Sequence, residues 1–134
     1  MSAVYLDSSA FVKVVVRERG SAALRAFLAG SDARRVSSAL LRTEAMRAVR
    51  DLGPDALAAV REGIRRVDLI GIDDRILDVA GSLPPGVLRT LDAIHLATAL
   101  LYRERSREEV ILATHDAALG RAARACGVPV LGAD

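Results

Sequence analysis

Segments typical of strands and of helices alternate along the whole chain, and this alternation constrains the fold more than any other feature. Short apolar stretches are followed by polar turns and then by longer stretches with helical periodicity. The predicted strands span residues 3–6, 35–38, 67–72, 110–114 and 128–131. The predicted helices span residues 11–16, 21–29, 40–52, 54–66, 73–82, 90–105 and 116–125. We therefore predict an α/β fold, a three-layer sandwich with a short central parallel sheet joined by right-handed crossovers.

Length and composition favour a single folding unit. The 134 residues contain no repeat, low-complexity tract or interdomain linker, so we expect one domain over residues 1–134. Hydrophobic residues make up 51% of the chain but aromatic residues only 3%. The core is therefore predicted to consist of Ala, Leu, Val and Ile, which suits helices packed closely on a sheet.

The N-terminal residues and the cysteine content indicate a soluble cytoplasmic protein. Cys126 is the only cysteine, so no intramolecular disulfide can form and no signature of an oxidising compartment is present. The first residues contain neither a basic leader nor an apolar run long enough for a signal peptide or a membrane span. We expect no association with a membrane.

The net charge of the chain gives little indication of its binding partners, whereas the excess of arginine over lysine is more informative. The chain has 19 Lys+Arg against 17 Asp+Glu, a net charge of +2, which does not by itself predict binding to nucleic acid. Lys13 is the only lysine, and every other basic residue is an arginine, whose planar group can bind a phosphate through two hydrogen bonds. Biased codon usage explains this preference equally well.

Two acidic residues come directly after predicted strands. Asp7 follows the first strand and Asp116 follows the fourth. Ligands of open parallel sheets bind beyond the carboxyl ends of the strands. Each residue also precedes a predicted helix, so taken alone each is better explained as a helix N-cap, which is common at this position.

Two further acids lie on inward-facing helix surfaces. Glu44 is at the margin of an apolar helix face, away from the arginines of its own helix. That face consists of Leu40, Leu41, Ala45, Ala48 and Leu52, and the arginines are Arg42, Arg47 and Arg50. A carboxylate turned toward the core needs a partner, which can be an arginine, a helix cap or a metal ion.

Asp92 opens the most apolar helix of the chain, where a first-turn acid is stabilised by the helix dipole after Thr90 as N-cap. His95 lies one turn further on, and we expect it to hydrogen-bond to Asp92 rather than to bind a metal. The sequence contains no arrangement of His and Cys that resembles a transition-metal site.

Convergence of these four acids on one cleft would be unfavourable without cations, because like charges at close range repel. Carboxylate and water oxygens select hard ions, so the predicted cofactor is Mg²⁺ or Mn²⁺ rather than Zn²⁺.

Several segments together resemble the PIN-domain ribonucleases, in particular the VapC toxins of bacterial toxin–antitoxin pairs. The matching parts are residues 4–13, Glu44 in its arginine-rich helix, residues 91–99, residues 112–116 and residues 127–130. Their order and spacing fit over almost the whole chain, although residues 54–88 carry little family-specific information.

The resemblance implies that Asp7, Glu44, Asp92 and Asp116 are the catalytic, metal-binding acids. Ser9 and Thr114 match small hydroxyl positions that order the surroundings of the metal, while His115 departs from the family pattern and leaves Asp116 the least secure of the four. The implied reaction is endonucleolytic hydrolysis of RNA by metal-activated water, without a protein nucleophile.

The resemblance also implies three partners: an RNA substrate, a cognate antitoxin whose segment covers the acidic cleft, and a second copy of the chain in a homodimer. Candidate RNA contacts are Arg17, Arg19, Arg42, Arg47 and Arg89, and a solvated helix face explains any one of them equally well. Because aromatic residues are few, we expect recognition of RNA shape and backbone rather than base stacking.

Other functions fit less well. A phosphatase with an aspartyl nucleophile would need a second Asp two residues after Asp7, where the chain has Ser9, and a glycine-rich nucleotide-binding loop is absent from the sequence. The serious alternative is a catalytically silent PIN-like module that binds RNA or a protein without cutting. The intact set of four acids favours the nuclease.

Overall fold

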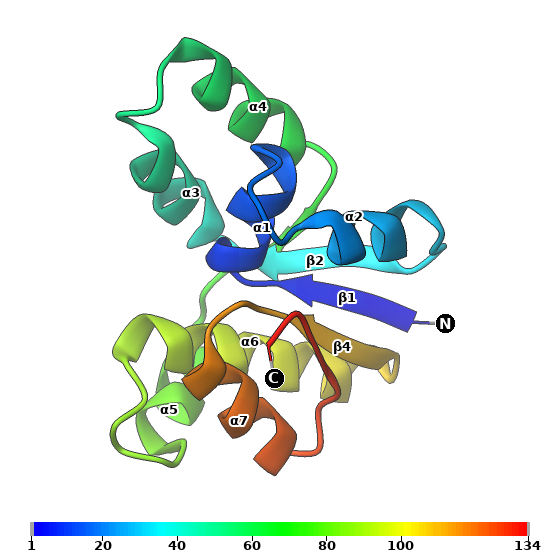
Figure 1. The fold of residues 1–134 in the computed structure, drawn as a ribbon. Coiled ribbons are helices and arrows are strands. Elements are labelled where there is room, and N and C mark those ends of the chain that lie inside the picture. Colours follow the sequence, from blue (N-terminus) through cyan, green and yellow to red (C-terminus); the bar gives the residue numbers. More distant parts are fainter. Residues whose placement is uncertain (1, 134) are drawn as a thin grey trace.

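Five parallel strands form the central sheet of the protein, as seen in a computed structural model that describes residues 2–133 (Figure 1). The strands are β1 (Ser2–Leu6), β2 (Arg34–Ser38), β3 (Asp68–Ile70), β4 (Glu109–Ala113) and β5 (Val130–Leu131). Their order across the sheet is β3-β2-β1-β4-β5, and every neighbouring pair is parallel. All five predicted strands are therefore confirmed, with β3 and β5 shorter than expected.

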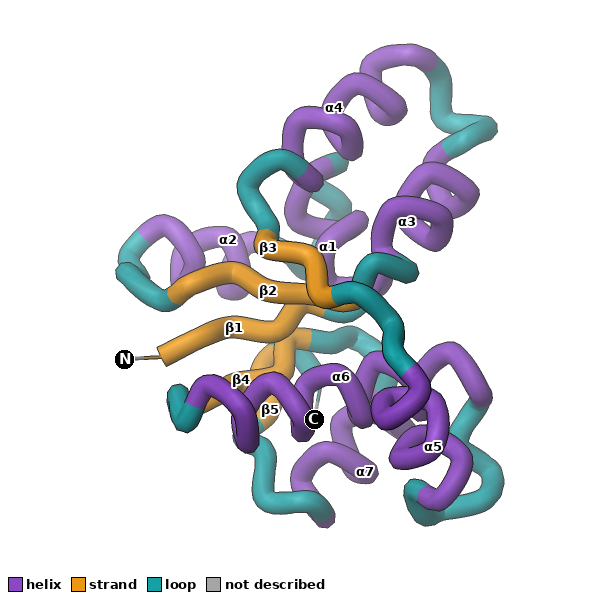
Figure 2. The backbone as a smooth tube through the Cα atoms, turned by 180° about the vertical axis from the view of Figure 1, so that it is seen from behind, coloured by secondary structure: helices purple, strands orange, loops and turns teal. Residues whose placement is uncertain are grey.

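Helices cover both faces of this sheet, which confirms the predicted three-layer α/β sandwich (Figures 1 and 2). The helices in residues 2–133 are α1 (Ser8–Val15), α2 (Ala22–Ala29), α3 (Leu41–Val49), α4 (Pro54–Ile64), α5 (Asp74–Ser82), α6 (Thr90–Ser106) and α7 (Ala117–Ala125). Helices α1 to α4 lie on one face, and α5 to α7 lie on the other. Within the described part of the chain, no helix combines the length and the apolar character needed to cross a membrane.

Strand β1 is the centre of the core. Val4 and Leu6 pack among the side chains of α1 to α4, whereas Ala3 and Tyr5 pack on the opposite side with α6 and α7. This alternation follows from the two-residue period of a strand. Because both faces are covered, all four side chains are at most 2% exposed. The residue that follows β1 is therefore held on a rigid, buried support.

The winding direction of the sheet reverses beside β1. The chain proceeds from β1 to β2 and β3 on one side, and then crosses to place β4 on the other side of β1. Leu6 at the end of β1 pairs with Ala113 at the end of β4. Asp7 and Thr114 therefore follow two adjacent strand ends, at the crevice where open parallel sheets bind ligands.

Polar caps set the starts of several helices. The side chains of Asp7, Asp73 and Asp116 accept hydrogen bonds from backbone N–H groups in the first turns of α1, α5 and α7. Helix α6 differs from the prediction, because Thr90 is its first residue and Arg89 occupies the N-cap position without a side-chain cap.

Helix α3 also differs from the prediction, because it ends at Val49. Leu52 lies in the turn beyond it and is 59% exposed, so placing Leu52 on the apolar face of this helix was wrong. Ala48 is exposed as well, and Val49 is the residue that enters the core. A helical wheel does not apply once the chain leaves the helix, which explains the error at Leu52.

Candidate active site

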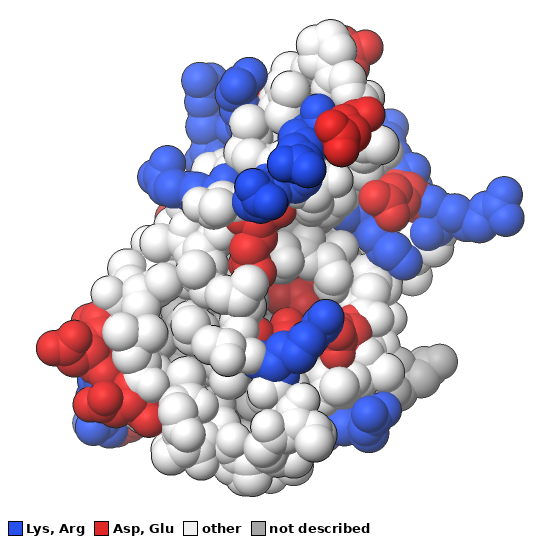
Figure 3. Space-filling view, turned by 90° about the vertical axis from the view of Figure 1, so that its left-hand side faces the viewer, with Lys and Arg blue, Asp and Glu red and all other residues white. Residues whose placement is uncertain are grey.

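All four predicted acids line one pocket of about 390 Å³ at the carboxyl edge of the sheet. The lining residues are Asp7, Ser8, Ser9, Glu44, Arg89, Thr90, Leu91, Asp92 and Asp116. Figure 3 shows acidic side chains gathered in a hollow of this surface, with a basic side chain lying across it. The structure thus brings together carboxylates from two strand ends and from helices in both outer layers.

Asp7 is the most deeply buried of these acids, with 3% of its surface exposed. Its Oδ1 accepts hydrogen bonds from the Ala10 N–H at 2.9 Å and the Ser9 hydroxyl at 2.7 Å, and its Oδ2 accepts one from the Thr114 hydroxyl. Burial raises the pKa of Asp7 above its ordinary value, although these three hydrogen bonds oppose the shift. The two hydroxyl residues predicted to order the site therefore contact Asp7 directly.

The same hydroxyls connect Asp7 to the segment that carries Asp116. The backbone N–H of His115 donates to Ser9 Oγ at 3.1 Å, and that of Asp116 donates to Thr114 Oγ1 at 3.0 Å. Asp116 also caps α7, because its Oδ1 accepts from the Leu119 N–H at 2.9 Å. The cap interpretation and the pocket interpretation of Asp116 are thus both satisfied by the geometry.

Arg89 bridges two of the acids across the mouth of the pocket. Its Nε donates to Asp92 Oδ2 at 3.4 Å, and its Nη2 donates to Asp116 Oδ2 at 3.2 Å. The pKa of Asp92 is raised, mainly by burial and further by the nearby charge of Asp116, while Arg89 opposes the shift. The sequence had suggested Arg89 only as an RNA contact, although its position three residues before Asp92 is a signal for such a pair.

Glu44 meets His95, and this contact corrects the expected partner of the histidine. The distance from His95 Nε2 to Glu44 Oε1 is 2.5 Å, and His95 Nδ1 lies 2.7 Å from the Tyr5 hydroxyl. The prediction that His95 bonds to Asp92 was wrong, because Asp92 instead pairs with Arg89. The inward position of Glu44 is confirmed, since its side chain is only 18% exposed.

His115 contacts the residues around Asp7 through its backbone N–H, which donates to Ser9 Oγ. Its imidazole Nε2 is buried and has no hydrogen-bond partner among the described residues. The ring lies against Gly132, where an added Cβ would be 3.4 Å from His115 Cε1. His115 is not among the residues that line the acidic pocket.

The carboxylate oxygens of the pocket suit a hard divalent cation, but these side chains do not lie close enough together to form a complete metal site. Within residues 2–133, no three His, Cys, Asp or Glu side chains lie close enough together to hold a metal ion as they stand. Four carboxylates face one lining arginine, and burial raises the pKa of two of them. A cation bound here would offset this excess of negative charge, in competition with Arg89, which contacts one oxygen of Asp92 and one of Asp116.

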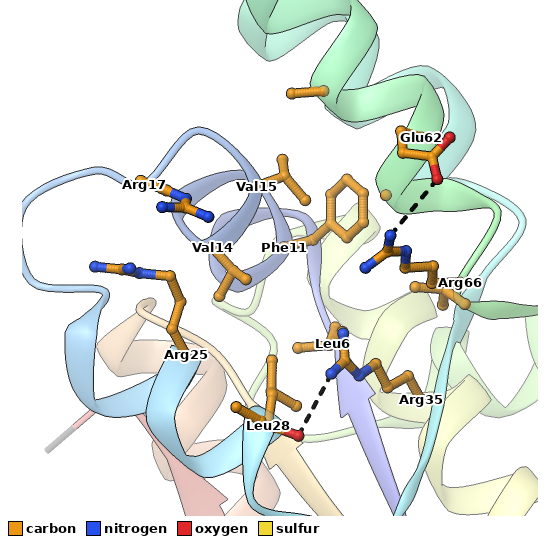
Figure 4. A pocket seen from close by; sticks show the side chains of 14 residues that line it. Leu6, Phe11, Val14, Val15, Arg17, Arg25, Leu28, Arg35, Glu62 and Arg66 are labelled. Atoms are coloured by element: carbon orange, nitrogen blue, oxygen red, sulfur yellow. Dashed lines mark hydrogen bonds and ion pairs between the residues drawn. The ribbon is translucent and has the colours of Figure 1, made fainter.

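The other predicted RNA-contacting arginines lie outside the acidic pocket. Arg19, Arg42 and Arg47 are exposed at the surface. Arg17 lines a different cavity, of about 460 Å³, between α1, α2 and α4. Figure 4 shows that Arg17, Arg25, Arg35 and Arg66 surround an apolar floor in this cavity, with Arg66 paired to Glu62. It shares no lining residue with the acidic pocket.

Comparison with known proteins gives a consistent result. The family model described as PIN domain matches residues 4–125. A relative named Ribonuclease VapC46 from Mycobacterium tuberculosis is 48% identical over 131 residues, or 98% of each chain. Ribonuclease VapC35 from the same species is 42% identical over 97 residues, or 72% of each chain.

A similar fold is found in a solved structure described as a toxin-antitoxin complex from Klebsiella pneumoniae. The TM-score is 0.66 at 21% sequence identity, with 97% of this chain and 96% of that chain covered. At this identity the likeness concerns the fold.

Proposed function

The chain belongs to the PIN-domain family as a ribonuclease of the VapC type, and from this membership we propose that its acidic pocket holds Mg²⁺ or Mn²⁺ for the hydrolysis of RNA. The observation that carries the proposal is the convergence of Asp7, Glu44, Asp92 and Asp116 on one pocket at the switch point of the sheet. Capping explains why Asp7 and Asp116 occur where they do, but it does not explain why two helix-borne acids from other segments face them.

The four acids have different roles in this proposal. Asp7 and Asp92 are the direct ligands, Glu44 supports them, and Asp116 acts through a water molecule. The bond from the Leu119 N–H to Asp116 Oδ1 is consistent with the last role, because it engages one of the two carboxylate oxygens. When bound, the cation would acidify a water molecule and stabilise negative charge on the phosphate.

The neighbouring side chains keep these acids in place. Ser9 and Thr114 hold both oxygens of Asp7, so the orientation of this buried carboxylate does not depend on the cation alone. Arg89, once displaced from Asp92 and Asp116, becomes free to contact an RNA phosphate beside the cleavage position. The exposed Arg42 and Arg47 on α3 would contact the RNA backbone further away, and the same role is proposed for Arg17 and Arg19 beyond α1.

We further propose that the protein is the toxin of a type II toxin–antitoxin pair, in line with the VapC names of its relatives. A segment of the cognate antitoxin would cover the acidic cleft and place a basic side chain among the acids. Arg89 illustrates that a guanidinium group can bridge two of these carboxylates.

Homodimerisation is part of the same proposal. Leu77, Val87 and Leu91 are 47%, 87% and 47% exposed, respectively. They supply apolar surface on and near α5 and α6 that a second copy of the chain would cover. We also propose that residues 1–134 act as one domain and that the protein is cytoplasmic.

The test of the enzymatic proposal is cleavage of total RNA by purified protein in Mg²⁺ or Mn²⁺. Asp7→Asn, Asp92→Asn and an EDTA sample serve as controls, and we expect cleavage that disappears in all three. Cleavage that persists in the controls would point to a contaminant or to another site. RNA binding without cleavage by the wild type would favour the catalytically silent module.

A further inference from the structure

A buried pair of polar side chains stands behind Glu44, and none of the roles described above uses it. His95 on α6 is 1% exposed and Tyr5 on β1 is 0% exposed. Together with Glu44, these two residues form a chain of three hydrogen-bonded groups. The Tyr5 hydroxyl lies 2.7 Å from His95 Nδ1, and His95 Nε2 lies 2.5 Å from Glu44 Oε1. Of the three, only Glu44 lines the acidic pocket.

The direction of these hydrogen bonds follows from the chemistry of the partners. When a carboxylate is ionised it can only accept, and the partner of Glu44 Oε1 that then carries the hydrogen is His95 Nε2. Burial raises the pKa of the Tyr5 hydroxyl, which therefore keeps its proton at neutral pH and can donate it to Nδ1. In a neutral imidazole one nitrogen donates and the other accepts, so this arrangement selects the tautomer with hydrogen on Nε2.

The pair formed by Tyr5 and His95 lies where it can link the two helical layers. Glu44 lies on α3 in one helical layer, while His95 lies on α6 in the other layer, three residues after Asp92. The hydrogen bond from His95 to Glu44 thus connects the two helices that bring Glu44 and Asp92 to the pocket. It also engages Oε1 of Glu44, which leaves Oε2 available to a ligand in the pocket that Glu44 lines.

We propose that Tyr5 and His95 are positioning residues: they orient Glu44 through a directed pair of hydrogen bonds, so that Oε2 of Glu44 is preorganised for a divalent cation. This inference rests on the metal-binding role proposed above. Without the His95 donor, the flexible Glu44 side chain would turn away from the negative charges of Asp7 and Asp92, which line the same pocket. Partners that orient ligands in this way are worth roughly 10- to 100-fold in metal affinity.

The first test measures Mn²⁺ binding by electron paramagnetic resonance, without RNA. We expect His95→Leu to weaken binding by roughly 10- to 100-fold and Tyr5→Phe, which keeps the donor to Glu44, to weaken it less. His95→Gln places an amide N–H near the position of Nε2, and we expect it to recover much of the affinity. Leu101→Ala on the same helix is the control, because it removes a side chain that is 3% exposed and lies outside the pocket. It should destabilise the fold without weakening Mn²⁺ binding.

A second test observes the imidazole directly in wild-type protein. The chain has two histidines, so ¹⁵N-histidine NMR spectra are simple, and a His115→Gln variant assigns them. We expect the spectra of metal-free protein to show hydrogen on Nε2 of His95, and Tyr5→Phe to alter the distribution of hydrogen between the two ring nitrogens.

The outcomes separate this inference from the proposal on which it rests. Wild-type protein that does not bind Mn²⁺ would refute the metal-dependent function. Wild-type binding together with unchanged affinity in folded His95→Leu protein would refute the positioning role alone. A His95 tautomer with hydrogen on Nδ1 alone would also refute the positioning role. Because this NMR result is obtained from wild-type protein, it can be interpreted even if His95→Leu does not fold.

Discussion

Replacing Arg89 by Gln should make metal binding tighter, although the change removes a side chain that lines the candidate site. Arg89 contacts one oxygen of Asp92 at 3.4 Å and one oxygen of Asp116 at 3.2 Å, so it competes with a cation for these carboxylates. The substitution removes the competing positive charge while keeping a shorter, polar side chain.

The size of the effect follows from the exposure of the arginine. Its side chain is 78% exposed, so solvent screens both ion pairs. An ion pair of this kind contributes about 0.2–1 kcal/mol, and the two together therefore contribute roughly 0.4–2 kcal/mol. Because 1.4 kcal/mol corresponds to a tenfold change in an equilibrium constant, we expect Arg89→Gln to bind Mn²⁺ roughly 2- to 30-fold more tightly.

The assay is a Mn²⁺ titration monitored by electron paramagnetic resonance at low and high salt. The gain in affinity should shrink at high salt, because the lost interactions are electrostatic and partly exposed. Arg61→Gln is the matched control, since it makes the same change of charge at an exposed position on α4 outside the acidic pocket. At saturating Mn²⁺, the loss of a phosphate contact should raise the KM for RNA.

Arg89→Gln protein that binds Mn²⁺ as weakly as the wild type, or more weakly, would contradict this prediction. Such a result would mean that Arg89 does not compete with the cation, or that it positions Asp92 for binding. An equal gain in Arg61→Gln would instead indicate an effect of net charge, unrelated to the bridge across the pocket.

Two further predictions concern the stability of the fold. The pKa of Asp7 in the folded protein lies above its ordinary value of 3.8, so the contribution of Asp7 to stability is greatest below pH 3.8 and is lost as the pH rises through the folded-state pKa. In urea titrations with EDTA, we therefore expect the wild type to lose stability relative to Asp7→Asn as the pH rises. A stability difference that stays constant with pH would contradict this. Gly132→Ala should destabilise the protein by about 1–3 kcal/mol or more, because Gly132 has a φ of +98° and an added Cβ would lie 2.7 Å from the Thr114 carbonyl oxygen. Gly81→Ala, inside α5 with nothing within 4 Å of the new Cβ, should instead stabilise it slightly in thermal unfolding, and similar effects of the two substitutions would speak against the strain argument.

Local features of this chain could be predicted from its sequence because they depend on residues a few positions apart. The strands, the helices and the caps at Asp7 and Asp116 all follow from short apolar periods and from contacts within one turn. The failure at Leu52 has the same origin, because the helical period predicts its environment only as long as the helix continues. The inward position of Glu44 was also predictable, but the identity of its partner was not.

The tertiary structure decided the contacts between residues far apart in the chain. Pairing of β1 with β4 brings Thr114 to Asp7 across 107 positions. The placement of α3 and α6 in opposite helical layers, both reaching the carboxyl edge of the sheet, brings His95 to Glu44 across 51 positions. Sequence spacing favoured Asp92 as the partner of His95, since it lies one helical turn away. The distances, the burial that raises the pKa of Asp7, and the bridge formed by Arg89 depend instead on strand order and layer packing, to which every segment of the chain contributes.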